Sequence, residues 1–400
     1  MYIRTLLQHY LFADMIVLGK MSIRQILDDD LAGTVLPAHQ LLDRMNDEIE
    51  ATHDPRHNMA ARMEIFRARA AGSYLDILRG ICQNRCRIRR TLFHTILDWD
   101  NLQLDAEELD TELRQFTNEV PISDPEISEQ PIYEYPLSSW AYYYKLQQME
   151  WQIQMGFELD IYQADELARM YWYLQYLAKT RIRHLERIRG FVVRRYSSSR
   201  NTPSITNEQK QEYANTLTFI TFATNQATAI YHLSDALSCL FVVLERLKLL
   251  ETPPRPYSND QMRFEVRMKP FLSIGLPELI PLSQLSDLVN QPSESTLDLL
   301  AFASESATLA KKKYEALSKL TAKESFSQGC HDAWVKNVKD EMKATIFTGV
   351  SVASVLKLVE KVVKGKRKVK AVKLEGFKVD VPVAGKGYHD WWVVPKVVPE

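Results

Sequence analysis

The sequence predicts an all-α protein: a multi-helix bundle with long amphipathic helices and a short strand-like or extended C-terminal tail. Glycine contributes only 13 of 400 residues, about half of average usage, which disfavours folds rich in tight turns. Apolar residues recur every three or four positions over long stretches, as on the buried face of a helix. From Val369 onward charged and apolar residues alternate instead, which is typical of a strand.

The bulk composition limits the possible functions. Hydrophobic residues make up 46% of the chain, enough for a sizeable core, and 400 residues are enough for two or three domains. A formal net charge of −1 predicts neither a nucleic-acid binder nor a binder of acidic ligands. Four cysteines without a secretory pattern at the N-terminus indicate free thiols in a reducing compartment, so we expect a cytoplasmic protein.

Residues 1–120 are predicted to form an N-terminal helical region. Its amphipathic segments are Tyr2–Leu18, Ser22–Leu31, a helix from Pro37 to about Thr52, Asn58–Leu97 and Ala106–Phe116. Four prolines within sixteen residues then predict a linker over residues 121–139.

Residues 140–250 are the predicted central helical core. A first helix is expected from about Trp140 to Phe157, and a second from about Ala164 to Arg189 with Gly190 directly after its end. The apolar stripe of the second helix is Leu167, Met170, Leu174, Leu177, Leu185 and Ile188. Asp165 and Glu166 complement the helix dipole, although partner binding is an alternative role for this acidic turn.

A third core helix is expected to begin at the capping-box pattern of Thr206 and Gln209 and to run toward Leu250. Between Tyr213 and Phe241 only Asp235 is charged, so a membrane span is one interpretation of this segment. Its many threonines and amides favour a helix buried in a bundle, because a span requires about 18 consecutive apolar residues. We therefore expect no membrane contact.

The C-terminal part begins with a predicted irregular, Pro-rich connector over residues 251–293. Helices are expected over residues 294–364, as the segments Ser293–Leu320, Lys323–Phe347 and Ser351–Lys364. Residues 365–400 are a basic and aromatic tail. Its lysines should stay in solvent while its tryptophans dock, preferably on the chain's own bundle and otherwise on a partner.

No catalytic, cofactor-binding or metal-ligating residue is predicted. The chain has no Walker motif, no Gly-x-Gly-x-x-Gly and no Gly-x-Ser-x-Gly elbow. Cys82 and Cys86 share a helix face but lack further ligands at metal spacing. His184 lies among basic residues, so we expect it in solvent or beside the helix end.

Two groups of residues are candidates for contact with macromolecules. Aromatic residues are dense from Tyr133 to Tyr176 and again near the C-terminus, where core packing and partner contact are both possible roles. The partner-binding candidates are Tyr142, Tyr143, Tyr171, Trp172, Trp391 and Trp392. The candidates for ribosome or RNA contact, with a solvated face as the alternative, are Arg187, Arg194, Arg195, Lys364, Lys366, Arg367 and Lys368.

Three ordered runs carry a family resemblance: Met-Gly-Phe-Glu-Leu at Met155–Leu159, Met-Tyr-Trp-Tyr-Leu at Met170–Leu174 and Arg-His-Leu-Glu-Arg-Ile at Arg183–Ile188. They resemble the large auxiliary subunit of the NatC N-terminal acetyltransferase. The Met-Asp-Pro-Lys motif of that family's N-terminal part does not occur, so we expect the chain to correspond to the family's C-terminal portion.

The resemblance implies a non-catalytic scaffold that holds the NatC catalytic subunit and a small Sm-like subunit near the ribosome. NatC acetylates nascent chains that begin with Met and a bulky apolar residue. No cofactor and no small-molecule substrate of its own is implied. The single Gly-x-Gly, Gly385-Lys386-Gly387, lacks the Arg or Gln of an acetyl-CoA site, since Pro382 occupies that position. The alternatives are a helical RNA- or ribosome-binding adaptor unrelated to acetylation, and an enzyme with an unrecognised helical site.

Overall fold

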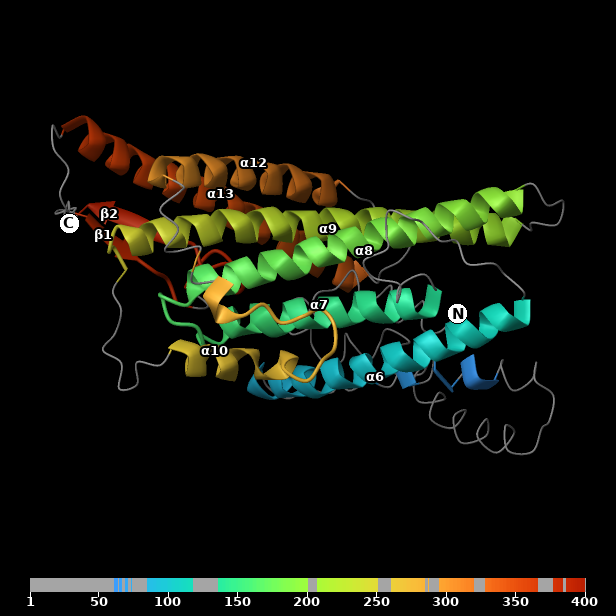
Figure 1. Ribbon diagram of the computed structural model, residues 1–400. Coiled ribbons are helices and arrows are strands. Elements are labelled where there is room, and N and C mark those ends of the chain that lie inside the picture. The colour runs from blue at the N-terminus through green and yellow to red at the C-terminus, as the bar shows by residue number, and fades with distance from the viewer. Residues whose placement is uncertain are drawn as a thin grey trace.

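The computed structural model describes residues 61–63, 65–66, 69–70, 73, 85–117, 136–200, 207–250, 260–284, 287, 295–319, 328–365, 377–383 and 386–399. The predicted helices before Ala61 and the basic segment 366–376 lie outside this part of the chain. Within it, long helices lie roughly side by side along one axis, with a small two-stranded sheet at one end (Figure 1). The all-α prediction is confirmed, including the strand-like C-terminal tail.

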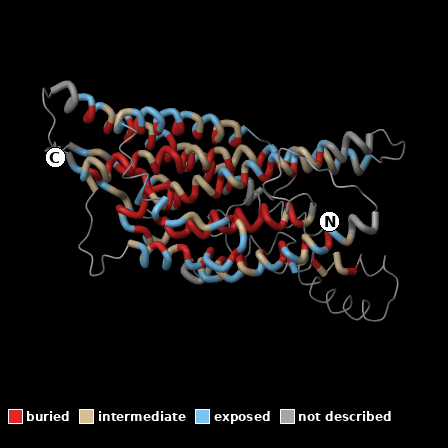
Figure 2. Tube along the Cα trace, in the orientation of Figure 1, coloured by how far each residue is buried: buried red, intermediate tan, exposed pale blue. Residues whose placement is uncertain are grey.

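The long helices pack mainly on their neighbours in the chain, in the order α6, α7, α8, α9, α12 and α13. α6 is Arg85–Thr117 and α7 is Pro136–Glu158. A single hydrophobic core includes residues of all six helices and of the tail, so the predicted segments share one interior. Buried residues follow the inner sides of the helices, while exposed residues lie on the outside (Figure 2).

α7 is the most enclosed helix, since every residue from Ala141 to Phe157 is buried. Its first turn is held by Asp110 of α6, whose carboxylate accepts hydrogen bonds from the backbone N–H groups of Leu137 (3.2 Å) and Ser138 (2.9 Å). The Asp110 carboxylate lies at the N-terminus of α7 and accepts from backbone N–H groups that have no acceptor within that helix. Burial raises the pKa of Asp110 to about 6.

α8 is Leu167–Arg200, and all six residues of its predicted apolar stripe are buried. The predicted helix end at Gly190 is wrong, because the helix continues ten residues further. One helical glycine costs only about 1 kcal/mol relative to alanine, less than the remaining turns can contribute. A Cβ at Gly190 would meet nothing within 4 Å, so no packing constraint requires glycine there.

α9, Asn207–Arg246, packs along α8. It ends in a Schellman-type turn, in which Lys248 adopts a left-handed conformation (φ 55°) and the Leu249 N–H donates to the Leu244 carbonyl at 3.0 Å. Among the residues that the structure describes, two helical segments could cross a membrane by length and composition. The most apolar window of Tyr213–Arg246 is 78% buried, whereas that of Trp334–Glu360 is 44% buried.

The connector prediction is wrong for part of its length. α10, Asp260–Met268, and a 3₁₀ turn η3, Lys269–Phe271, form where irregular chain was expected. Phe264 and Met268 lie one helical turn apart, and both are buried against the bundle. Tertiary packing thus stabilises α10, although the prolines on either side of it had favoured a prediction of irregular structure.

α12 is Thr296–Ser318, capped by Ser295, whose hydroxyl accepts from the Asp298 N–H at 3.1 Å. α13 is Gln328–Gly365, one helix of 38 residues where two were expected. The predicted break between Phe347 and Ser351 is wrong. β1, Phe377–Asp380, and β2, Lys396–Pro399, pair antiparallel with Phe377 opposite Pro399 and Asp380 opposite Lys396.

Candidate functional site

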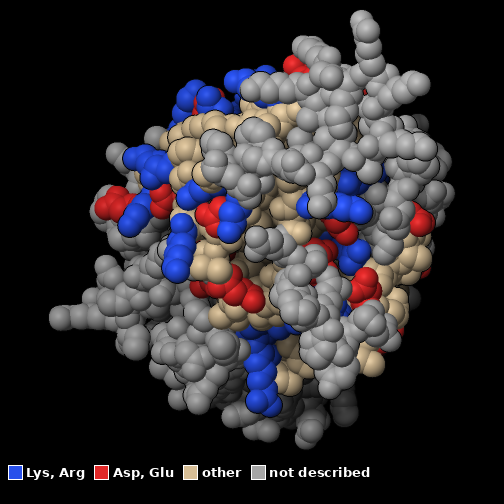
Figure 3. Space-filling view, turned by 90° about the vertical axis from the view of Figure 1, so that its left-hand side faces the viewer, with Lys and Arg blue, Asp and Glu red and all other residues tan. Residues whose placement is uncertain are grey.

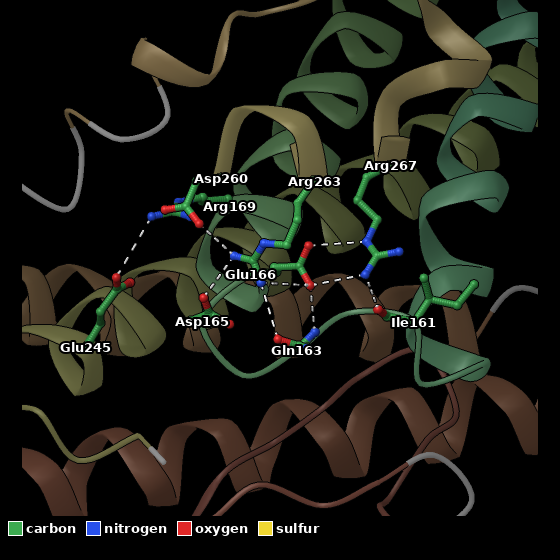
Figure 4. A network of polar contacts seen from close by, with 9 residues as sticks. All are labelled: Ile161, Gln163, Asp165, Glu166, Arg169, Glu245, Asp260, Arg263 and Arg267. Atoms are coloured by element: carbon green, nitrogen blue, oxygen red, sulfur yellow. Dashed lines mark hydrogen bonds and ion pairs between the residues drawn. The ribbon is translucent and has the colours of Figure 1, made fainter. Parts of the chain in front are cut away.

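The turn between α7 and α8 is bound to α10 by two arginines (Figure 4). Arg263 donates to Asp165 at 3.1 Å, and Arg267 donates through Nε to Glu166 at 3.2 Å. Arg267 also donates to the backbone carbonyl of Ile161 at 2.7 Å. Both carboxylates are buried, and charge-assisted hydrogen bonds of this kind are stronger than neutral ones.

The acidic turn therefore has its counter-charges within the same chain. Glu166 also accepts from the backbone N–H of Gln163 at 3.0 Å, a hydrogen bond within the turn that precedes α8. The helix-capping role of these carboxylates stays a prediction, and their observed role is tertiary, through the ion pairs with α10. Beside this cluster Arg169 lies 4.0 Å from Glu245, which connects α8 to the end of α9.

The C-terminal tail docks on the bundle through Tyr171 of α8. The Tyr171 hydroxyl donates to the Trp391 carbonyl at 3.2 Å and accepts from the Val393 N–H at 2.7 Å. Its ring stacks on Phe157 with centroids 4.2 Å apart and on Trp392 at 6.0 Å. Burial raises the pKa of Tyr171, so the hydroxyl stays neutral and can donate and accept at once.

The two tail tryptophans reach different helices. The Trp391 indole donates to Glu158 at the end of α7 (3.2 Å), and the Trp392 indole donates to Glu341 of α13 (3.3 Å). Glu341 also accepts from Tyr314 of α12 at 3.3 Å. The tail thus connects α7, α8 and α13, and it docks on the chain's own bundle, as the sequence favoured.

Polar contacts along α13 complete this docking. The His389 Nε2 donates to Asn337 at 3.1 Å, and its Nδ1 accepts from the Trp391 N–H at 3.1 Å. Ser351 donates to the Pro395 carbonyl at 2.5 Å. Sequence patterns identify none of these partners, because they lie 44 to 52 residues apart except for the local contact within the tail.

The aromatic partner-binding candidates lie mostly inside the chain's own core. Tyr142, Tyr143, Tyr171, Trp391 and Trp392 are each at most 2% exposed, and only Trp172 is half-buried. A ring buried at this level offers no surface to a partner, so we assign these five rings to packing within the chain instead of partner contact. The structure brings Tyr171, Trp391 and Trp392 together, whereas Tyr142 lies beside His184 with centroids 4.9 Å apart.

The basic candidates are spread over two helices. Arg187 is half-buried on α8, beside the exposed Lys179, Arg183 and Arg189. Arg194 and Arg195 belong to the last turns of α8, and Lys364 to the end of α13. Lys366, Arg367 and Lys368 lie outside the described residues. At the end of the bundle seen in Figure 3, basic and acidic side chains are interspersed with one another and with uncharged residues.

Sequence analysis missed the polar groups buried between α7 and α8. Arg181 and Glu150 are both 1% exposed and lie 3.0 Å apart. Lys145 donates to Asp100 of α6 at 2.7 Å. The helical period contained a usable signal, since Arg181 and His184 continue the spacing of Leu174, Leu177 and Leu185 and therefore share their buried face.

The expectation that His184 is solvated is wrong. The side chain is 2% exposed, and its Nε2 donates to the Ser139 carbonyl at 2.6 Å. Burial lowers the pKa of His184 to about 4, the Ser139 hydrogen bond opposes this effect, and the charge of Arg187 adds to it. The neutral imidazole therefore joins the start of α7 to the middle of α8.

His184 should make the stability of the fold sensitive to acid. Its pKa in the folded protein is below the unfolded value of about 6.5, so the unfolded chain binds a proton first as the pH falls. The contribution is complete above about pH 6.5 and declines by about 3 kcal/mol as the pH approaches 4. We expect the stability difference between the wild type and His184→Gln to shrink by this amount in urea titrations at pH 7 and pH 4.

The comparison with His184→Gln removes the contributions that other titrating groups make to the pH dependence of stability. The raised pKa values of Asp110 and Glu150, about 6 and about 7, make both proteins gain stability as the pH falls. Those contributions cancel in the difference. A stability difference that is the same at both pH values would contradict the buried neutral imidazole.

Comparisons with known proteins give a consistent result. A family profile described as "NAA35-like, TPR repeats" matches residues 1–375. The chain is 24% identical over 233 residues to "N-alpha-acetyltransferase 35, NatC auxiliary subunit" of Saccharomyces cerevisiae, covering 51% of this chain and 28% of that protein. The protein of the same name from Schizosaccharomyces pombe is 23% identical over 252 residues, covering 62% of this chain and 31% of that one. The chain thus spans less than a third of the length of these two relatives.

Solved structures show the same architecture. A chain in the "Crystal structure of the NatC complex bound to Gag peptide and CoA" matches with a TM-score of 0.61 at 16% identity. The match covers 84% of this chain and 48% of that chain. A chain of the apo NatC complex matches with the same TM-score, coverage and identity. At this identity the likeness establishes the fold.

Proposed function

The chain belongs to the NAA35-like family, and on that basis we propose that it is a non-catalytic scaffold subunit of a NatC-like N-terminal acetyltransferase. The profile match over most of the chain carries this proposal. The scaffold holds the catalytic subunit and a small Sm-like subunit in the cytoplasm. It supports co-translational acetylation of nascent chains that begin with Met followed by a bulky apolar residue.

The interior chemistry supports a structural role. The buried Glu150 and Arg181 pair between α7 and α8, and the buried Asp165 and Glu166 pair the turn before α8 with α10. Asp235, whose pKa burial raises to about 6, accepts from Gln175 at 2.6 Å and from Ser306 at 2.6 Å. Each of these groups joins two separate elements of the fold, as a rigid support requires.

Co-purification tests the scaffold proposal. The tagged chain, expressed with the catalytic and small subunits of its own organism, should retain both through size-exclusion chromatography. The complex should acetylate a Met-Leu peptide, whereas the chain alone should not turn over acetyl-CoA. Acetylation by the chain alone, or loss of both subunits from the wild-type chain, would refute the proposal.

Ribosome association is a further part of the proposed role. Its support is a row of three cations on α8, Lys179, Arg183 and Arg187, which are spaced four residues apart and so share one face of the helix. Lys179 and Arg183 are exposed, and Arg187 is half-buried. Cations that contact phosphates release counterions from the nucleic acid, and added salt makes this release less favourable, so binding weakens as the salt concentration rises. Ribosomal RNA should therefore accompany the purified complex at low salt and diminish at moderate salt. Salt-sensitive RNA without either subunit would favour the alternative of an RNA- or ribosome-binding adaptor.

A further inference from the structure

The outward side of α13 carries a ridge with an unusual pattern. Its members, all exposed, are Lys339, Lys343, Ile346, Val350, Ala353 and Lys357. Successive members are spaced by 4, 3, 4, 3 and 4 residues, which is the heptad spacing of a coiled-coil seam. Ile346 is 42% and Val350 is 54% exposed, although both are large aliphatic side chains.

The ridge accounts for much of the apolar surface that this helix leaves uncovered. The most apolar window of Trp334–Glu360 is only 44% buried, whereas that of Tyr213–Arg246 in the core is 78% buried. A narrow stripe of two or three apolar residues per two turns is the geometry that one further helix covers. From Lys339 to Lys357 the ridge measures about 27 Å, or about five helical turns.

The charges on the ridge select the kind of occupant. Apolar residues occupy its middle and lysines lie at both ends, with Lys343 paired to Asp340 at 2.8 Å and the exposed Glu360 three residues beyond Lys357. In an antiparallel pair of copies centred on Val350, Lys343 of one copy would face Lys357 of the other. In a parallel pair each lysine would face itself. Like charges oppose both arrangements, so the complementary partner carries carboxylates at its ends.

The surface beside the ridge also favours a helix over a lipid bilayer. Phe347 is only 37% exposed, since its ring stacks on Tyr388 of the docked tail with centroids 3.8 Å apart. The Lys396 ammonium lies over the Tyr388 ring, 5.5 Å from its centroid. The apolar strip is therefore bounded by an aromatic pair and cations. Interfacial membrane helices instead present a wide apolar face with Trp, Phe and Leu.

We propose that this α13 ridge docks one amphipathic helix of another subunit, with apolar residues at heptad spacing and Asp or Glu near both ends. The inference rests on the proposed scaffold function and deepens it by naming a surface and the chemistry of its occupant. The ridge forms one side of a short coiled coil, and the lysines set its register.

The decisive experiment uses the co-expressed complex. Ile346→Asp with Val350→Asp places carboxylates in the middle of the seam and should reduce the amount of captured subunit about tenfold or more. Lys343→Glu with Lys357→Glu keeps the apolar residues and should also weaken capture, because the ends would then repel the partner's carboxylates. Thermal melts of each variant, expected to match the wild type, show that the fold is retained.

A matched control is Val266→Asp, which makes the same substitution at an exposed position of α10, where Val266 is 62% exposed. Its capture should equal that of the wild type. A photo-crosslinking amino acid placed at Val350 should attach to a segment of a co-purified subunit, and peptide mass spectrometry should show heptad-spaced apolar residues flanked by acids.

Several outcomes would overturn the inference while leaving the scaffold proposal intact. One is that both ridge variants capture as much of the other subunits as the wild-type chain does. Another is that the crosslinker at Val350 attaches only to this chain or to a second copy of it. Binding of the wild-type chain, but not of the Ile346→Asp and Val350→Asp variant, to phosphatidylserine vesicles would assign the ridge to a membrane surface instead. If the wild-type chain captures no subunit at all, the scaffold proposal itself fails.

Discussion

Leu174→Asp is expected to unfold the helical bundle or to reduce its stability by more than about 5 kcal/mol. The Leu174 side chain is fully buried in the middle of α8, within the stripe that faces the core. Truncation of a buried leucine alone costs about 2–5 kcal/mol. An aspartate at this position also buries a carboxyl group without a partner. Burial of the charged form costs several kcal/mol more, and a raised pKa that keeps the group neutral costs free energy as well. Circular dichroism melts and size-exclusion profiles measure the loss.

The control for this substitution is Arg187→Asp on the same helix. Arg187 is half-buried beside exposed residues, and substitutions of partly solvated charges usually change stability by less than about 1 kcal/mol. The melting temperature should therefore fall far more in the Leu174 variant than in the Arg187 variant. Similar losses in the two variants would mean that α8 presents different faces to the core and to solvent than the structure shows.

Trp392→Ala is expected to release the C-terminal tail from the bundle and to cost about 3–5 kcal/mol. The indole is fully buried, stacks near Tyr171 and donates to Glu341 at 3.3 Å. Its removal leaves a cavity where α8, α13 and the tail meet. It also deprives the buried Glu341 carboxylate of one donor, which adds a desolvation cost. Limited proteolysis, followed by mass spectrometry of the C-terminal fragments, detects the released tail.

Val398→Ala tests whether this effect belongs to docking or to the small sheet. Val398 lies in β2 and is 46% exposed, so its truncation should change stability by no more than about 0.5 kcal/mol. Deletion of residues 386–400 should reproduce the destabilisation of Trp392→Ala. If the tail resists protease equally well in both point variants, the tryptophan does not anchor it.

Long, strongly periodic segments could be predicted because burial on one face of a helix leaves a local record in the sequence. The stripe from Leu167 to Ile188 is an example, and so is the helix from Asn207 onward. Single glycines and short polar runs were weaker guides. The ends expected at Gly190 and near Phe347 are absent, since packing along the neighbouring helices outweighs a local propensity cost of about 1 kcal/mol.

The candidate sites were harder to predict, because a residue type does not state its own exposure. Tyr142, Tyr171, Trp391 and Trp392 have the composition of an interface, yet each is enclosed by other parts of the same chain. The exposed seam at Ile346 and Val350 went unnoticed, because its apolar residues have the same helical period as the buried face of α13. Periodicity identifies an apolar stripe but not what covers it.

By itself the sequence determined the fold class, the apolar stripe of α8 and the three ordered runs that resemble a known family. These properties depend on residues close together along the chain, where helical geometry relates spacing to face. Only the tertiary structure decided that Arg181 pairs with Glu150, that His184 is neutral, and that Tyr171 holds a tail more than 200 residues away. Such contacts depend on which helices become neighbours and on how much water they exclude, and no local pattern encodes either quantity.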